Sequence, residues 1–163
     1  MHTDNITGGS VFLDTNILLY AFSTTRFSDA SERLLERIKA GEITGYINST
    51  VIDEFFHKAM LIEMYTEKHL SPRDAIIYIK EHPGILKDMD APYSITRDIM
   101  QEYNLIILDT LDILRDTLSI SRNYGLLFSD ALHAASAQKH QIDYFATNDR
   151  DFDRVDFLTL AHP

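Results

Sequence analysis

The amino-acid sequence predicts an α/β fold, a three-layer α/β/α sandwich in which a central parallel sheet lies between two layers of helices. Short apolar runs of strand length alternate along the chain with longer segments whose apolar residues recur at helical spacing. A helix between two strands of one sheet usually forms a right-handed crossover, which leaves the two strands parallel. The 163 residues contain no internal repeat or low-complexity tract, and this length suits one domain with a sizeable core.

The first half of the chain is predicted to form two strands and three helices. Residues 11–13 are a short apolar run, typical of a buried strand, and residues 17–22 are apolar enough for a packed helix. Residues 28–40 carry apolar side chains every three to four positions and are followed by a glycine, a frequent helix stop. Residues 44–47 form the second predicted strand, and a polar N-cap within residues 48–50 begins the third helix.

The second half is predicted to contain more helix than strand. Residues 71–89 have a helical pattern with Pro72 at a first-turn position and Pro83-Gly84 as a break. The remaining predicted elements are a helix at 90–102, a strand at 105–108, a helix at 112–124, a helix that begins near residue 129 and a strand at 144–147. The helix after residue 129 is small and rich in alanine, as suits a helix packed closely on a sheet.

Domain organisation follows from the same pattern. We expect residues 1–10 to be a flexible N-terminal segment and residues 11–163 to form a single domain. The mostly helical stretch at about 55–102 is expected to form a protruding arm, a helical insert in the middle of that domain.

Composition excludes several classes of site. The chain has no cysteine, so disulfides, thiolate zinc sites and cysteine nucleophiles are absent. No apolar run approaches the roughly 20 residues of a membrane span, and the first ten residues are polar, so we expect a soluble, cytoplasmic protein without a membrane partner. The formal net charge of -10 argues against a simple basic patch for nucleic acid, although acids that hold cations would reverse the local field.

Four acidic residues stand just beyond strand-like runs or in the first turns of the helices that follow them. They are Asp14, Glu54, Asp130 and Asp149. Because the carboxyl ends of parallel strands meet at one edge of a sheet, we expect these side chains to converge there. Carboxylate oxygens are the hard ligands that Mg²⁺ prefers, so the sequence predicts a divalent-metal site at that edge.

Other chemistries fit the sequence less well. The chain lacks a glycine-rich dinucleotide fingerprint, a phosphate-binding loop and the Gly-x-Ser-x-Gly elbow of serine hydrolases. Residues 149–153 alternate acids like the start of a calcium loop, but Arg154 occupies the glycine position and Leu160 the glutamate position. The pairs Glu54 with His57 and Asp130 with His133 have the acid-x-x-His spacing of di-iron proteins, a reading that requires a four-helix bundle.

Four segments resemble the motifs of PIN-domain nucleases. Residues 11–16 (Val-Phe-Leu-Asp-Thr-Asn) resemble the opening strand of that family, and residues 47–55 (Ile-Asn-Ser-Thr-Val-Ile-Asp-Glu-Phe) resemble its second acidic motif. Residues 128–135 (Phe-Ser-Asp-Ala-Leu-His-Ala-Ala) resemble the third, and residues 144–152 (Tyr-Phe-Ala-Thr-Asn-Asp-Arg-Asp-Phe) the closing motif. Order and spacing match as well, and the nearest likeness is to the VapC-type toxins of toxin–antitoxin pairs.

The resemblance implies a PIN-like sandwich and an endoribonuclease that depends on Mg²⁺ or Mn²⁺, with RNA as substrate, a cognate antitoxin as partner and a homodimer as the usual assembly. It assigns the catalytic and metal-binding roles to Asp14, Glu54, Asp130 and Asp149, with Asp151 as an alternative last acid. Polar supports for the cluster are implied at Asn16 and Thr147, and Ser49 either caps the helix that follows it or braces Glu54. The alternative function is a catalytically silent PIN-like module that binds RNA or protein.

Overall fold

A computed structural model describes all residues from 1 to 163, and its centre is a five-stranded parallel sheet with the strand order β3-β2-β1-β4-β5. The strands are β1 (Ser10–Leu13), β2 (Thr44–Asn48), β3 (Ile106–Leu108), β4 (Tyr144–Ala146) and β5 (Leu160–Ala161). The predicted parallel α/β fold is confirmed, and the first four strands lie within a residue or so of their predicted positions. The sequence analysis missed β5, because two residues are too short to carry a recognisable pattern.

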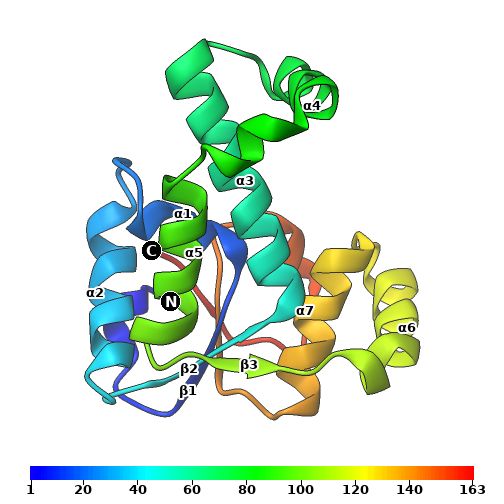
Figure 1. Ribbon diagram of the computed structural model, residues 1–163. Helices are drawn as coiled ribbons and strands as arrows, with labels where there is room; N and C mark the ends of the chain where they lie inside the picture. The colour runs from blue at the N-terminus through cyan, green and yellow to red at the C-terminus, as the bar shows by residue number, and fades with distance from the viewer.

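Helices cover both faces of the sheet, with α1, α2 and α5 on one side and α6 and α7 on the other (Figure 1). The α-helices are α1 (Thr15–Ala21), α2 (Ser28–Lys39), α3 (Ser49–Lys68), α4 (Pro72–Glu81), α5 (Ala91–Glu102), α6 (Leu114–Tyr124) and α7 (Phe128–Lys139). Four short 3-10 turns accompany them, η1 (Thr3–Asn5), η2 (Pro83–Lys87), η3 (Leu111–Ile113) and η4 (Arg150–Arg154). None of the helices is both long enough and apolar enough to span a bilayer.

The core is continuous from β1 to the C-terminal turns. Phe12 on β1 stacks on Phe145 of β4 with ring centroids 5.2 Å apart, and Phe145 meets Phe152 of η4 at 4.6 Å. The inward face of α7 is made mostly of alanine, which lets the helix lie close to the sheet as predicted. Close packing there brings Asp130 and His133 of α7 toward the carboxyl end of β1.

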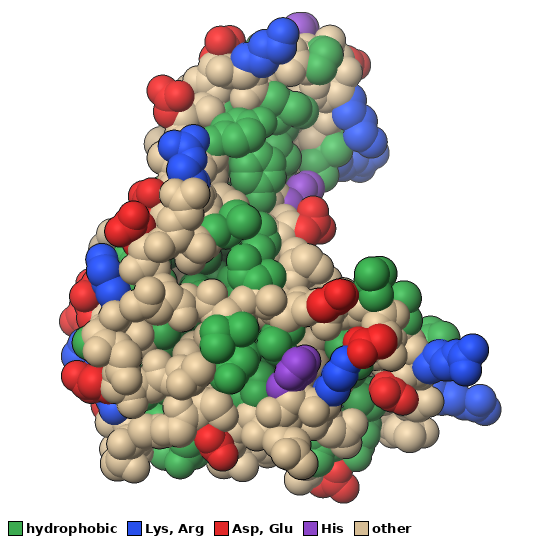
Figure 2. All heavy atoms as spheres, turned by 60° about the horizontal axis from the view of Figure 1, so that its bottom comes forward, with side chains coloured by type: hydrophobic (Ala, Val, Ile, Leu, Met, Phe, Trp, Pro, Cys, Tyr) green, Lys and Arg blue, Asp and Glu red, His purple; other side chains and the backbone are tan.

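The arm is built mainly from the far half of α3, which is 20 residues long, together with α4 and η2. These segments share a small core of their own, made by Met64, Ala75, Ile79 and Met89. The space-filling view shows the arm standing off from the body around a hollow, with hydrophobic side chains running from one into the other (Figure 2). α5, which the sequence analysis included in the arm, instead packs back along α3 toward the sheet.

The first residues of the chain are tied to its last strand. The Thr3 N–H donates to the carbonyl of His162 at 2.8 Å, and the His162 N–H donates to the carbonyl of Met1 at the same distance. Thr3 itself is buried. We expected residues 1–10 to be flexible, and the structure shows that the first of them are hydrogen-bonded beside β5. This edge strand was not predicted from the sequence.

Candidate active site

Asp14 lies at the carboxyl end of β1, where its side chain is almost fully buried. Its Oδ1 accepts the N–H of Thr15 at 2.6 Å, so the carboxylate caps the first turn of α1. Its Oδ2 accepts the side-chain amide of Asn16 at 2.5 Å and the hydroxyl of Thr147 at 2.6 Å. Asp14 is thus held by three donors, and Oδ1 keeps a lone pair for a further partner.

The predicted supports Asn16 and Thr147 also connect the two loops that carry Asp14 and Asp149. Asn16 Oδ1 accepts the backbone N–H of Asn148 at 3.2 Å, and the Thr147 hydroxyl accepts the N–H of Asp149 at 2.9 Å. These bonds join the end of β1 to the end of β4, which are neighbours in the sheet. The sheet register and the two polar side chains therefore fix the relative positions of both acids.

Glu54 projects from the second turn of α3, and about a quarter of its side chain is exposed. Its Oε2 accepts the hydroxyl of Thr15 at 2.6 Å, and His133 Nε2 lies 3.5 Å from the same oxygen. Burial raises the pKa of this carboxyl, but His133 and Thr15 outweigh it and hold the pKa at about 2. Glu54 is therefore ionised at neutral pH, and the side chain of Ser129, in the first turn of α7, contributes to the lowering of its pKa.

Asp130 stands in the first turn of α7 and accepts no hydrogen bond from the protein. Its pKa is raised to about 6, first by burial and then by the charges of Asp14, Asp149 and Glu54, against the opposing effect of His133. Burial also raises the pKa of Asp14. The structure thus brings Asp14, Glu54 and Asp149 within electrostatic reach of Asp130 at the carboxyl edge of the sheet.

Asp149 and Asp151 have different surroundings. Asp149 Oδ1 accepts the N–H of Asp151 at 2.8 Å and so caps η4, while its Oδ2 accepts no protein hydrogen bond. Asp151 is exposed, and its carboxylate is paired with the guanidinium of Arg154. Of these two acids, Asp149 is the one whose charge acts on Asp130.

Ser49 does not have the bracing role that the sequence suggested. Its side chain is exposed and donates to no other group, and the α3 cap is Asn48, whose Oδ1 accepts the N–H of Val51 at 3.1 Å. Glu54 is braced by Thr15 instead. The signal for Thr15 was its place between Asp14 and Asn16 in the opening motif, but the approach of α1 to α3 decides which hydroxyl reaches Glu54.

The fold excludes both the di-iron site and the calcium loop that the sequence had left as alternatives. A five-stranded sheet replaces the required four-helix bundle, and His57 is exposed on α3. Residues 150–154 form the turn η4 rather than a calcium loop.

The donor set fits a hard divalent cation. As they stand in the structure, no three side chains of Asp, Glu or His lie close enough together to hold a metal ion by themselves. Mg²⁺ does not need one, because it keeps several waters and is usually held by one or two carboxylates together with the phosphates of a substrate. Asp14 Oδ1 keeps a lone pair, Asp130 and Asp149 Oδ2 accept no protein hydrogen bond, and the mutual repulsion at Asp130 is what a cation would relieve.

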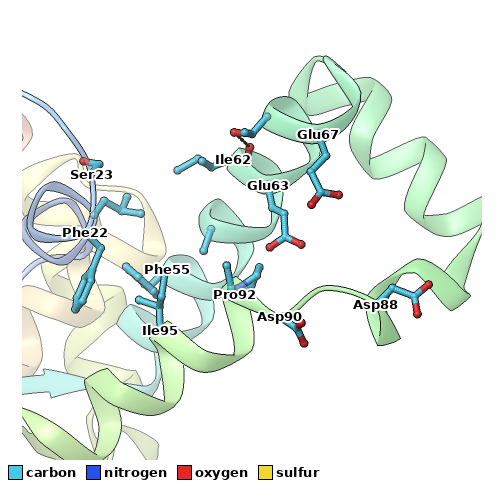
Figure 3. Close-up of a pocket in the computed structure, with 14 residues that line it drawn as sticks. Phe22, Ser23, Phe55, Ile62, Glu63, Glu67, Asp88, Asp90, Pro92 and Ile95 are labelled. Atoms are coloured by element: carbon cyan, nitrogen blue, oxygen red, sulfur yellow. Dashed lines mark hydrogen bonds between the residues drawn. The ribbon is translucent and has the colours of Figure 1, made fainter.

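A separate cavity of about 430 Å³ lies between the body and the arm, and none of the four acids lines it. Its apolar part is formed by Phe22, Phe55 and Ile95 near the body (Figure 3). Toward the arm it carries four acidic side chains and no lysine or arginine, namely Glu63, Glu67, Asp88 and Asp90.

Comparisons with known proteins identify the family of this chain. The PIN domain family profile matches residues 11–158. The chain is 32% identical over 152 residues to Ribonuclease VapC2 of Methanocaldococcus jannaschii, covering 92% of this chain and 91% of that protein. Among solved structures it resembles VapC20 of Mycobacterium tuberculosis, described as a sarcin-ricin loop cleaving toxin, with a TM-score of 0.58, 14% identity and coverage of 91% of this chain and 96% of that one. It also resembles VapBC2 from Rickettsia felis, solved with a DNA fragment from the promoter, with a TM-score of 0.54, 20% identity and coverage of 94% and 98%.

Proposed function

The chain belongs to the PIN domain family, and we propose that it is a metal-dependent endoribonuclease that hydrolyses RNA phosphodiester bonds, as the toxin of a toxin–antitoxin pair. The observation that carries the proposal is the convergence of Asp14, Glu54, Asp130 and Asp149 at one edge of the sheet. The likeness to a protein named as a ribonuclease extends over nearly the whole chain and supports the same activity.

The site offers no protein nucleophile, so we propose hydrolysis by water. The four carboxylates would hold a Mg²⁺ or Mn²⁺ ion, which would supply an acidified water and offset charge on the phosphate. Asp14 is the most rigid of the acids, because Thr15, Asn16 and Thr147 fix both of its oxygens. Glu54 contributes a carboxylate that stays ionised. In-line attack on phosphorus expels the 3′ oxygen, which leaves a 5′ phosphate and a 3′ hydroxyl.

The pairing of Asp151 with Arg154 supports Asp149 as the fourth acid of the cluster. The alternative function is a silent PIN-like module that binds RNA or protein without cutting. Retention of all four acids, each with free oxygens, favours the nuclease over that module.

Two partners follow from the proposal. An antitoxin is supported by the neighbouring toxin–antitoxin structures, and the acidic cavity beside the arm suits a partner segment that combines apolar side chains with Lys or Arg. A homodimer is supported by exposed leucines on η3 and α6, since Leu111 is 77% and Leu118 61% exposed. An RNA-cutting toxin would act in the cytoplasm, where its substrate is.

The test is cleavage of end-labelled structured RNA by the purified chain with Mg²⁺, with Mn²⁺ and with chelator. Asp14→Asn, prepared in parallel, controls for contaminating nuclease because the amide keeps the size of the side chain and removes its charge. Metal-dependent products that the variant does not make support the nuclease. Tight RNA binding with no cleavage under either metal would favour the silent module.

A further inference from the structure

His133 is a fully buried histidine beside the acidic cluster. It lies on α7 one turn after Asp130, is fully buried, and packs against Phe12 of β1 with ring centroids 5.6 Å apart. Neither ring nitrogen has a hydrogen-bond partner within ordinary distance. The rest of the inward face of α7 is apolar apart from Ser136, whose hydroxyl donates to the carbonyl of Leu132. An apolar side chain such as leucine is the usual residue in such a position.

Burying an imidazole without partners costs about 1 to 3 kcal/mol, so an unsatisfied pair of ring nitrogens calls for an explanation. The nearest acceptor is Glu54 Oε2, 3.5 Å from His133 Nε2. A movement of about half an ångström would turn this contact into an N–H···O bond of ordinary length. Thr15 already donates to that same Oε2 at 2.6 Å.

We propose that His133 is a positioning residue, which donates from Nε2 to Glu54 Oε2 in the working site. With Thr15 and His133 both on Oε2, the orientation of the Glu54 carboxylate toward a bound cation is fixed from the protein side. The inference rests on the proposed metal-dependent function. Partners of this kind, which orient a metal ligand from behind, typically change metal affinity by about 10- to 100-fold when removed.

The role requires a donor at the distance of Nε2, which defines the variants. His133→Leu fills similar space without a donor, His133→Gln places an amide N–H near the Nε2 position, and His133→Asn is polar but too short to reach Glu54. His140→Leu is the matched control, because His140 is exposed at the end of the same helix.

We would titrate Mn²⁺ into each protein by calorimetry, measure unfolding in urea, and determine kcat and KM on a cleaved RNA. His133→Leu is expected to bind Mn²⁺ about 10- to 100-fold more weakly and to lose kcat by a similar factor, with KM for RNA unchanged. Removal of the buried imidazole favours folding and loss of its contact with Glu54 opposes it, so the stability of this variant should stay close to that of the parent. His133→Gln should retain most of the metal affinity, and His140→Leu all of it.

Mn²⁺ affinity and kcat at parental levels in His133→Leu would overturn the inference, as would a loss in His133→Gln equal to that in His133→Asn. The Gln and Asn pair decides the question if the Leu variant does not fold. Calorimetry measures Mn²⁺ affinity without RNA cleavage, so it tests the role of His133 separately from the proposed nuclease activity. A parent that binds Mn²⁺ but cuts no RNA would contradict the proposed function while the role of His133 is still decided by affinity.

Discussion

Neutralising Asp130 should make the metal-free protein more stable while it abolishes cleavage. The side chain accepts no hydrogen bond, so Asp130→Asn removes little besides a charge. The pKa of about 6 in the folded protein, against 3.8 for the free group, means that ionised Asp130 works against folding. The cost is absent below about pH 3.8, grows as the pH rises to about 6, and is complete above that.

The shift of about two pKa units corresponds to at most about 3 kcal/mol. Water reaches the half-buried carboxylate and screens part of this unfavourable energy. We therefore expect the free energy of unfolding of Asp130→Asn to exceed that of the parent by about 1 to 2 kcal/mol near pH 8. About half of that gain should remain near pH 5, because the parent's Asp130 is then largely protonated. Saturating Mg²⁺ should shrink the difference, since the cation stabilises the parent more than the variant.

Urea denaturation of both proteins near pH 5 and pH 8, with and without Mg²⁺, measures these differences. Asp153→Asn is the matched control, because Asp153 is an exposed acid near the same edge with no effect on Asp130. A variant of Asp130 that is less stable than the parent near pH 8, or a gain that Asp153→Asn reproduces, would refute the idea of a repulsive carboxylate cluster.

Three further outcomes follow from the structure. Thr15→Val removes the hydroxyl that donates to Glu54 Oε2 and should lower kcat by about 10-fold. Cleavage rates measure the loss, and circular dichroism checks that the fold is retained. Unchanged rates would show that Thr15 does not support the site. Leu118→Glu should convert a dimer to monomer in size-exclusion chromatography with light scattering, because it places a charge in the exposed leucine surface; a dimer that persists would place the interface elsewhere. Glu63→Lys with Glu67→Lys should weaken antitoxin binding by about 10-fold or more in calorimetry and leave RNA cleavage intact; equal affinity would exclude the acidic cavity as the antitoxin contact.

Much of the fold was predictable because the signals were local. The strand at residues 11–13 and the alanine-rich helix after residue 129 were each visible as a pattern within a dozen residues. The two-residue β5 and the return of α5 to the body depend on tertiary contacts, and a local pattern does not record those.

The candidate site divides in the same way. Asp14 was predictable from its place after a strand, as were Asn16 and Thr147 from the family resemblance, and all three lie together. The choice of Thr15 over Ser49 as the donor to Glu54 was not predictable, because it depends on how α1 and α3 approach each other. His133 shows the converse case, since its spacing from Asp130 was visible but suggested a metal ligand in a different fold.

The most direct test of the central claim is the rate of RNA cleavage in Mg²⁺ by four single amide variants, at Asp14, Glu54, Asp130 and Asp149, beside Asp153→Asn. If the four acids form one metal-dependent site, each of those variants should cut at least about 100-fold more slowly than the parent, while Asp153→Asn should cut at the parental rate. Parental rates in any two of the four variants would contradict a shared carboxylate site at this edge of the sheet.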